Sequence, residues 1–108
     1  MYREIACNTV PLTRSLAEDF ATSPGWDGER ALSPHRLRYL RREYDAGRFH
    51  APRWCKAYMS GRVYRGNGQH SSRMLAELNG TFPAGMMVTI KEVLCVTPDD
   101  LVALLLRQ

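Results

Sequence analysis

The stretch that most constrains the fold is residues 53–78, in which a hairpin pattern leads through two glycines into a helix pattern. RWCKAYM and RVYRG have the composition of two strands, and Ser60-Gly61 between them suits a tight turn. GNGQ ends the second strand, and residues 70–78 carry apolar side chains at helical spacing, with Asn79-Gly80 as the stop. The sequence therefore predicts two antiparallel strands followed at once by a helix.

The segments on both sides of this unit carry further signals for strands and for the starts and ends of helices. A loose alternation predicts a strand near residues 2–9, and the apolar run MMVTIKEVLCV predicts a largely buried strand at 86–96. Three further helices are expected after capping residues, two of which are followed by proline. The first begins at Thr13 or Ser15 and ends near Ala21. The second begins at Ser33-Pro34 and ends near Ala46. The third begins at Thr97-Pro98. The turn formers in TSPGWDGER predict a surface loop at 22–30.

Together these elements predict a small α+β fold: one domain over residues 1–108, with a short mixed sheet, flanking helices and a strand-to-helix junction. A chain of 108 residues suits one core. No apolar run approaches the roughly 18 residues that span a bilayer. The N-terminal MYREIACNTV lacks the apolar core of a signal peptide. A cytoplasmic protein without a membrane partner is expected.

The cysteines and histidines do not predict a metal site. Cys7, Cys55 and Cys95 are odd in number and far apart, which suits neither disulfides nor a CxxC zinc site. Each lies in an apolar stretch, so buried thiols are expected. The three histidines are not at the spacing of helical metal ligands. No metal-ligand set is therefore predicted.

The charge is concentrated in the middle of the chain. The formal net charge is +4, but residues 36–73 carry ten arginines and lysines against two carboxylates, and each flank carries a net charge of −2. Such segregation favours an anionic partner, a nucleotide or a nucleic acid. Thirteen of the fifteen basic residues are arginine, which suits bidentate phosphate contacts.

Two groups of residues outside the junction are candidates for nucleic-acid contacts. Arg38, Arg41 and Arg42 lie on the polar side of the helix predicted at 34–46, where they either bind phosphates or form a solvated face. Trp26 and Trp54 either stack on bases or pack within the protein.

The junction itself has two interpretations. Glycines and short polar side chains make a good turn for geometric reasons alone. The same residues suit a phosphate, because the backbone N–H groups near Gln69, His70 and Ser71 would lie at a positive helix terminus. Serine hydroxyls can bond a phosphate oxygen or cap the helix, and Arg65 and Arg73 lie within reach. His70 is the candidate catalytic residue, as a proton donor or acceptor.

The stretch YRGNGQHSSRML, residues 64–75, resembles the nucleotide-binding motif of the ParB/sulfiredoxin superfamily. Members of that superfamily place a short G-x-H-R or G-E-R-R motif at a strand-to-helix junction, where it grips nucleotide phosphates. The order of elements over residues 54–96 is similar too. The resemblance implies phosphate binding by the matching positions, which are Gly66, Gly68, Gln69, His70 and Arg73. Together with the residues chosen by their chemistry, the candidate set also includes Ser71, Ser72 and Arg65.

The resemblance also excludes one activity. Sulfiredoxins carry their catalytic cysteine immediately before the histidine, where this chain has Gln69. An amide cannot replace a thiolate nucleophile, so peroxiredoxin repair is not expected. In partition proteins an arginine pair stands in the motif, whereas here Ser71 follows His70 and the arginine comes at Arg73.

The sequence therefore predicts a ParB-like domain that binds nucleotide or nucleic-acid phosphate, with ATP or CTP and magnesium as the implied ligands. If catalytic, it would be a metal-assisted phosphoryl hydrolase, an NTPase or nuclease. The alternative is a non-catalytic inhibitor or protein-binding module of a phage, plasmid or other mobile element. A third possibility is a DNA-binding accessory domain of a longer chain. The apolar LVALLL segment at 101–106 makes a homodimer through the C-terminal helix a further expectation.

Overall fold

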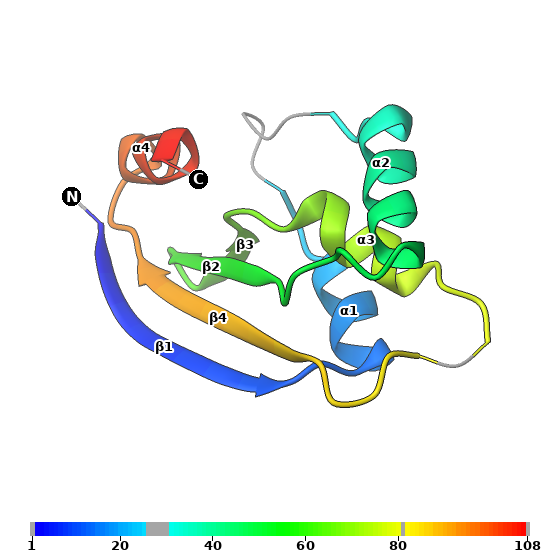
Figure 1. The fold of residues 1–108 in the computed structure, drawn as a ribbon. Helices are drawn as coiled ribbons and strands as arrows, with labels where there is room; N and C mark the ends of the chain where they lie inside the picture. Colours follow the sequence, from blue (N-terminus) through cyan, green and yellow to red (C-terminus); the bar gives the residue numbers. More distant parts are fainter. Residues whose placement is uncertain (1, 26–30, 81, 108) are drawn as a thin grey trace.

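The computed structural model describes residues 2–25, 31–80 and 82–107, which form four strands and four helices. The strands are β1 (Arg3–Pro11), β2 (Arg53–Met59), β3 (Arg62–Arg65) and β4 (Met87–Leu94). The helices are α1 (Arg14–Ala21), α2 (Pro34–Asp45), α3 (Gln69–Ala76) and α4 (Pro98–Arg107). The sheet has the order β1-β4-β2-β3 (Figure 1). β4 pairs antiparallel with β1 and parallel with β2, and β3 pairs antiparallel with β2. The predicted α+β class with a mixed sheet is confirmed.

Helices α1 and α3 cover one set of side chains of the central strands. Trp54 of β2 is almost fully buried, and its ring stacks on Phe20 of α1 with centroids 4.6 Å apart. Leu75 of α3 and Val88 of β4 belong to the same cluster and are fully buried. Because Trp54 lies under the segment that links β3 to α3, this cluster supports the junction from below.

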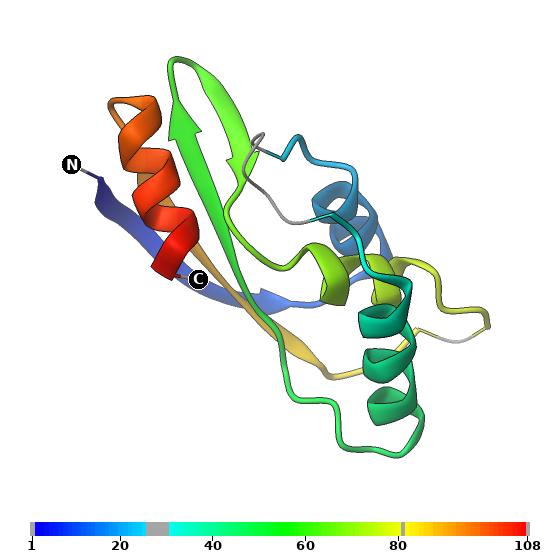
Figure 2. The same ribbon diagram turned by 90° about the horizontal axis from the view of Figure 1, so that it is seen from above.

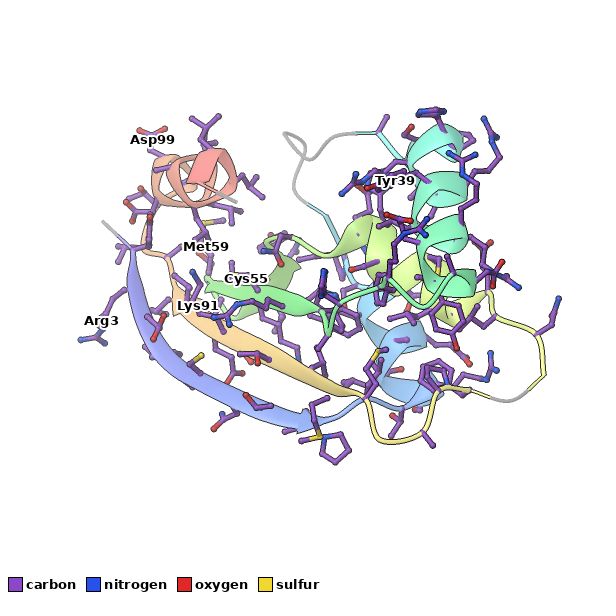
Figure 3. All side chains as sticks on the ribbon, viewed as in Figure 1. Arg3, Tyr39, Cys55, Met59, Lys91 and Asp99 are labelled. Atoms are coloured by element: carbon purple, nitrogen blue, oxygen red, sulfur yellow. The ribbon has the colours of Figure 1, made fainter. Side chains whose placement is uncertain are left out.

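Helix α4 covers the side chains of the central strands that alternate with this first set. Neighbouring strand residues point to opposite faces, so Cys55 and Met59 are directed away from the side occupied by Trp54. They form a second cluster with Val93 of β4 and with Leu101 and Leu104 of α4 (Figure 3). Both views of the ribbon show α4 at the other end of the sheet from α1, α2 and α3 (Figures 1 and 2).

The C-terminal helix is apolar almost all round, but it buries one side only. Leu101 and Leu104 are fully buried within this chain, whereas Val102 and Leu106 are 42% and 84% exposed. The helix therefore packs against its own chain and does not need a second copy to bury its apolar side. A homodimer through it stays a prediction. No helix among the described residues has the length and apolarity that a membrane span requires.

The start of α4 is held by reciprocal hydrogen bonds. Thr97 Oγ1 accepts from the Asp100 backbone N–H at 3.3 Å, and Asp100 Oδ2 accepts from the N–H groups of Val96 and Thr97 at 3.0 Å each. This arrangement is a capping box, and the Asp100 side chain is buried.

Replacing Asp100 by alanine is expected to lower the free energy of unfolding by about 1–2 kcal/mol, because two backbone donors lose their acceptor. Asp99→Ala is the matched control, since Asp99 lies beside Asp100 in the same turn and is exposed. Urea denaturation measures both. Equal losses for the two variants would show that charge at the helix start, and not the capping box, stabilises α4.

Strand β1 is the least covered element. It lies at the edge of the sheet, and along its nine residues only Ala6 and Val10 are even partly buried. The thiol of Cys7 is therefore exposed, which corrects the expectation that all three cysteines are buried; Cys55 and Cys95 are buried as expected. The apolar stretch around Cys7 suggested burial, but Cys7 lies on the exposed part of an edge strand.

The thiols are expected to react in two classes. Burial raises the pKa of the Cys55 thiol to about 11 and also raises the pKa of Cys95, so both stay protonated and inaccessible at pH 8. A thiol-specific chromogenic reagent should label one cysteine in the folded protein and three after denaturation. The Cys7→Ser variant should show no rapid labelling. Rapid labelling of that variant would contradict the burial described here.

One helix boundary differs from the sequence expectation, and one predicted segment is only partly described. Helix α3 ends at Ala76, before the predicted stop at Asn79-Gly80. Trp26 and part of the predicted loop lie outside the described residues. Trp54 is a core residue and cannot stack on a base without unfolding of its cluster.

Candidate functional site

A groove of about 830 Å³ lies between α2, the start of α3 and α4. Its floor is the segment 66–71, which links β3 to α3. In the ribbon, α4 and α2 stand on the two sides of this segment (Figure 1). The remaining lining residues come from the two walls and from the start of β2: Ala31, Ser33, Arg36, Leu40, Arg53, Val102, Leu105 and Leu106.

Both glycines of the floor lie close against buried side chains of β2. Gly68 has a φ of +83°, and a Cβ at this position would stand 2.4 Å from Trp54 Cδ1. A Cβ on Gly66 would stand 3.0 Å from Cys55 Sγ. The backbone therefore passes directly over two buried side chains of β2; only glycine fits at position 68, and a Cβ at position 66 would be tightly packed. Close packing against β2 is therefore sufficient to explain the glycines at 66 and 68 as turn residues. The same packing determines the shape of the floor.

The start of α3 has no side-chain cap. Its N-cap is Gly68, which has no side chain to form a capping hydrogen bond, although a serine cap was one expectation from the sequence. The Ser71 hydroxyl accepts a hydrogen bond from Trp54 Nε1 at 2.8 Å, and the buried Ser72 hydroxyl donates to the carbonyl of Gln69 at 3.2 Å. The backbone N–H groups of the first turn form a positive helix terminus that suits an anion. Gln69, His70 and Ser71, which carry these groups, line the groove.

His70 joins the starts of two helices. Its Nε2 accepts a hydrogen bond from the backbone N–H of Ser33 at 2.9 Å, and Ser33 is the N-cap of α2. The contact requires an unprotonated Nε2 and fixes α2 against α3 beside the groove. The sequence did not indicate this positioning role. A catalytic role for His70 stays a prediction.

Arg65 has a different role from the predicted one. Its guanidinium is buried and donates to the carbonyls of Phe20 and Ala21, at 3.0 and 2.8 Å. These carbonyls close the C-terminal end of α1, where a cation is favourable. Arg65 does not line the groove. The expectation of a phosphate contact is therefore corrected: the side chain holds α1 against the sheet.

The other predicted residues divide between the groove and its surroundings. Gly66, Gly68, Gln69, His70 and Ser71 line the groove, whereas Ser72, Arg73, Arg38, Arg41 and Arg42 do not. Arg73 is half-buried on α3. The three arginines of α2 are exposed, as predicted.

Two basic residues of the groove were missed by the sequence analysis. Arg36 and Arg53 line it, one from α2 and one from the start of β2. Neither makes a salt bridge with any described carboxylate. The two carboxylates of α2 are paired with other arginines, Asp45 with Arg41 at 3.1 Å and Glu43 with Arg48 at 2.6 Å. The hydrogen bond from Arg48 also lowers the pKa of the Glu43 carboxyl.

The wall opposite α2 is apolar. Val102, Leu105 and Leu106 of α4 face the arginines across the floor, and part of this apolar surface is exposed. The sequence signal for this wall was the number of apolar residues in α4, which is larger than one buried side of a helix requires. A groove with two cations and a positive helix terminus on one side and leucines on the other suits a ligand with an anionic and an apolar part.

Metal ligands and thiols do not converge on the groove. Among the described residues, no three histidine, cysteine, aspartate or glutamate side chains gather into a possible metal site. Cys55 lies beneath the floor as a protonated thiol, since burial raises its pKa to about 11.

The chain matches no protein-family model, no curated protein and no solved structure.

Proposed function

We propose that the protein binds a nucleotide in the groove between α2 and α4. The observation that carries the proposal is a groove that combines two arginines, Arg36 and Arg53, neither paired with a described carboxylate, with an apolar wall across the same floor. The phosphates would lie at the start of α3 and accept from its N–H groups and from the two guanidinium groups. The base would lie against Val102 and Leu106 of α4.

The electrostatic part of this arrangement favours phosphate over a neutral ligand. Arginine binds phosphate through paired N–H donors, and charge-assisted bonds of this kind contribute about 1.5–3 kcal/mol each. The helix terminus adds a smaller favourable term. A ligand with two or more phosphates can engage both arginines and the helix start at the same time.

The apolar part favours a ligand with a ring. Leu106 is 84% exposed in the absence of a ligand, so a base placed on it removes apolar surface from water. Such burial contributes roughly 25 cal/mol per Å². Free phosphate would gain none of this, so a nucleotide should bind more tightly than inorganic phosphate.

The resemblance of residues 64–75 to the ParB/sulfiredoxin motif supports the same ligand class, with ATP or CTP and magnesium as the ligands to test. Hydrolysis is the further step of this proposal, with magnesium brought by the nucleotide phosphates and His70 beside them. These ligands are abundant in the cytoplasm, which is the location we propose.

A second candidate function is protein binding through α4. The exposed side chains of Val96, Val102 and Leu106 favour it, because they form apolar surface at one end of the molecule. The occupant would be a second copy of the chain or a target protein. It would compete with a nucleotide for the same wall.

Calorimetric titration with ATP, CTP, GTP and ADP, with and without magnesium, tests the proposal. We expect saturable binding of at least one nucleotide and no comparable heat from inorganic phosphate. If no nucleotide binds and analytical ultracentrifugation shows a dimer that Leu106→Glu dissociates, the protein-binding function is the correct one.

A further inference from the structure

The outer surface of α2 carries positive charge that the protein does not neutralise. Both carboxylates of the helix are occupied by other arginines, Asp45 by Arg41 and Glu43 by Arg48. Arg38 and Arg42 are exposed and make no salt bridge with a described residue. They are four residues apart, so they lie on one side of the helix about 6 Å apart along its axis.

An exposed aromatic ring connects these arginines to the groove. Tyr39 is 41% exposed on α2 (Figure 3), and the guanidinium of Arg36 lies 5.2 Å from the centre of its ring. Arg36 lines the groove. Residues three or four apart are neighbours on a helix surface, so Arg36, Tyr39, Arg42 and Arg38 form a continuous run from the groove outward.

We propose that this run, hereafter the α2 track, binds a single-stranded nucleic acid. Arg38 and Arg42 would bind successive backbone phosphates, and one base would stack on Tyr39. Alternation of cations with an exposed aromatic ring is what single-strand binding requires, because the backbone is charged and each unpaired base has a flat apolar face. The path of the nucleic-acid strand, with one of its nucleotides in the groove, rests on the proposed function. Binding of that strand to the α2 track does not depend on the proposed function.

The features of the track favour a single strand over other polyanions. In a duplex the bases are stacked on each other, so Tyr39 and the apolar wall of α4 would have no face to contact. An acidic peptide would use Arg38 and Arg42 but would gain little from the ring. A single strand uses the cations and the ring together.

Fluorescence anisotropy with a labelled twelve-nucleotide oligothymidylate tests the inference. Arg38→Ala/Arg42→Ala should weaken binding about tenfold at moderate salt and reduce the slope of log affinity against log salt by about 1.4, the value for two lost phosphate contacts. Tyr39→Ala should weaken binding about tenfold, and Tyr39→Phe, which keeps the ring, should not. Arg41→Ala is the control on the same helix, since Arg41 is exposed but paired with Asp45.

Competition and mononucleotide titrations complete the test. The Arg38→Ala/Arg42→Ala variant, which changes no residue of the groove, should leave the affinity for a mononucleotide unchanged. A loss for Arg41→Ala equal to that for Arg38→Ala/Arg42→Ala, or equal competition by poly-glutamate and by a duplex of the same length, would overturn the inference. If mononucleotides bind and the oligonucleotide gains nothing, the α2 track fails while the proposed function stands. If the oligonucleotide binds through Tyr39, Arg38 and Arg42 while no mononucleotide binds, the track stands and the proposed function fails.

Discussion

Replacing Gly68 by alanine is expected to lower the free energy of unfolding by about 2–5 kcal/mol, enough to unfold much of a small domain at 37 °C. Two costs add at this position. A residue with a side chain is strained at a φ of +83°, and the new Cβ would overlap the ring of Trp54 at 2.4 Å. Relief of the overlap would shift a ring that stacks on Phe20 and donates to the Ser71 hydroxyl.

Gly47→Ala separates the two costs. Gly47 has a similar φ of +75°, but a Cβ there would meet nothing within 4 Å, so this variant bears the backbone strain alone, about 1–2 kcal/mol. Thermal and urea denaturation of the two variants give the comparison. Equal losses would contradict the close approach of the floor to Trp54, on which the shape of the groove depends.

The joint replacement of Arg36 and Arg53 by alanine is expected to weaken nucleotide binding at least about 100-fold. Each guanidinium is expected to form a charge-assisted bond with phosphate, and two such bonds contribute about 3–6 kcal/mol together. Neither side chain holds a described carboxylate, so the fold should be retained. Calorimetric titration measures the change, and circular dichroism and thermal denaturation check the fold.

The control for this pair is Arg41→Ala/Arg62→Ala. Both residues are exposed, neither lines the groove, and the change in net charge is the same. This control should bind nucleotide with little change at physiological salt, because exposed charges beyond about 8 Å are largely screened. A loss equal to that of Arg36→Ala/Arg53→Ala would show that the protein attracts nucleotides only by its overall charge.

Local signals in the sequence predicted the elements well. Ser33 followed by Pro34 begins α2 as expected, and Thr97 followed by Pro98 begins α4. Ser60 and Gly61 turn the hairpin with positive φ at both positions. These features are determined by a few adjacent residues, through capping bonds and allowed backbone angles, so they are visible without knowledge of the rest of the chain.

The features that the sequence did not predict depend on contacts between distant segments. Cys7 is exposed because β1 is an uncovered edge strand, and no local pattern specifies the strand order. Arg65 was expected at a ligand but holds the end of α1, more than forty residues earlier in the chain. Arg53 reaches the groove because β2 begins beside the start of α3. The phosphate candidates at 66–71 were located by their local motif, whereas the two groove arginines required the fold.

The central claim is that a nucleotide occupies the groove, and an ¹H–¹⁵N correlation spectrum recorded during titration with ATP or CTP and magnesium tests it most directly. We expect saturable shifts of the backbone amides of Gly66, Gly68 and Gln69 at the floor, together with those of Val102 and Leu106 on the opposite wall. Shifts confined to another surface such as β1, or no shifts at millimolar nucleotide, would contradict it.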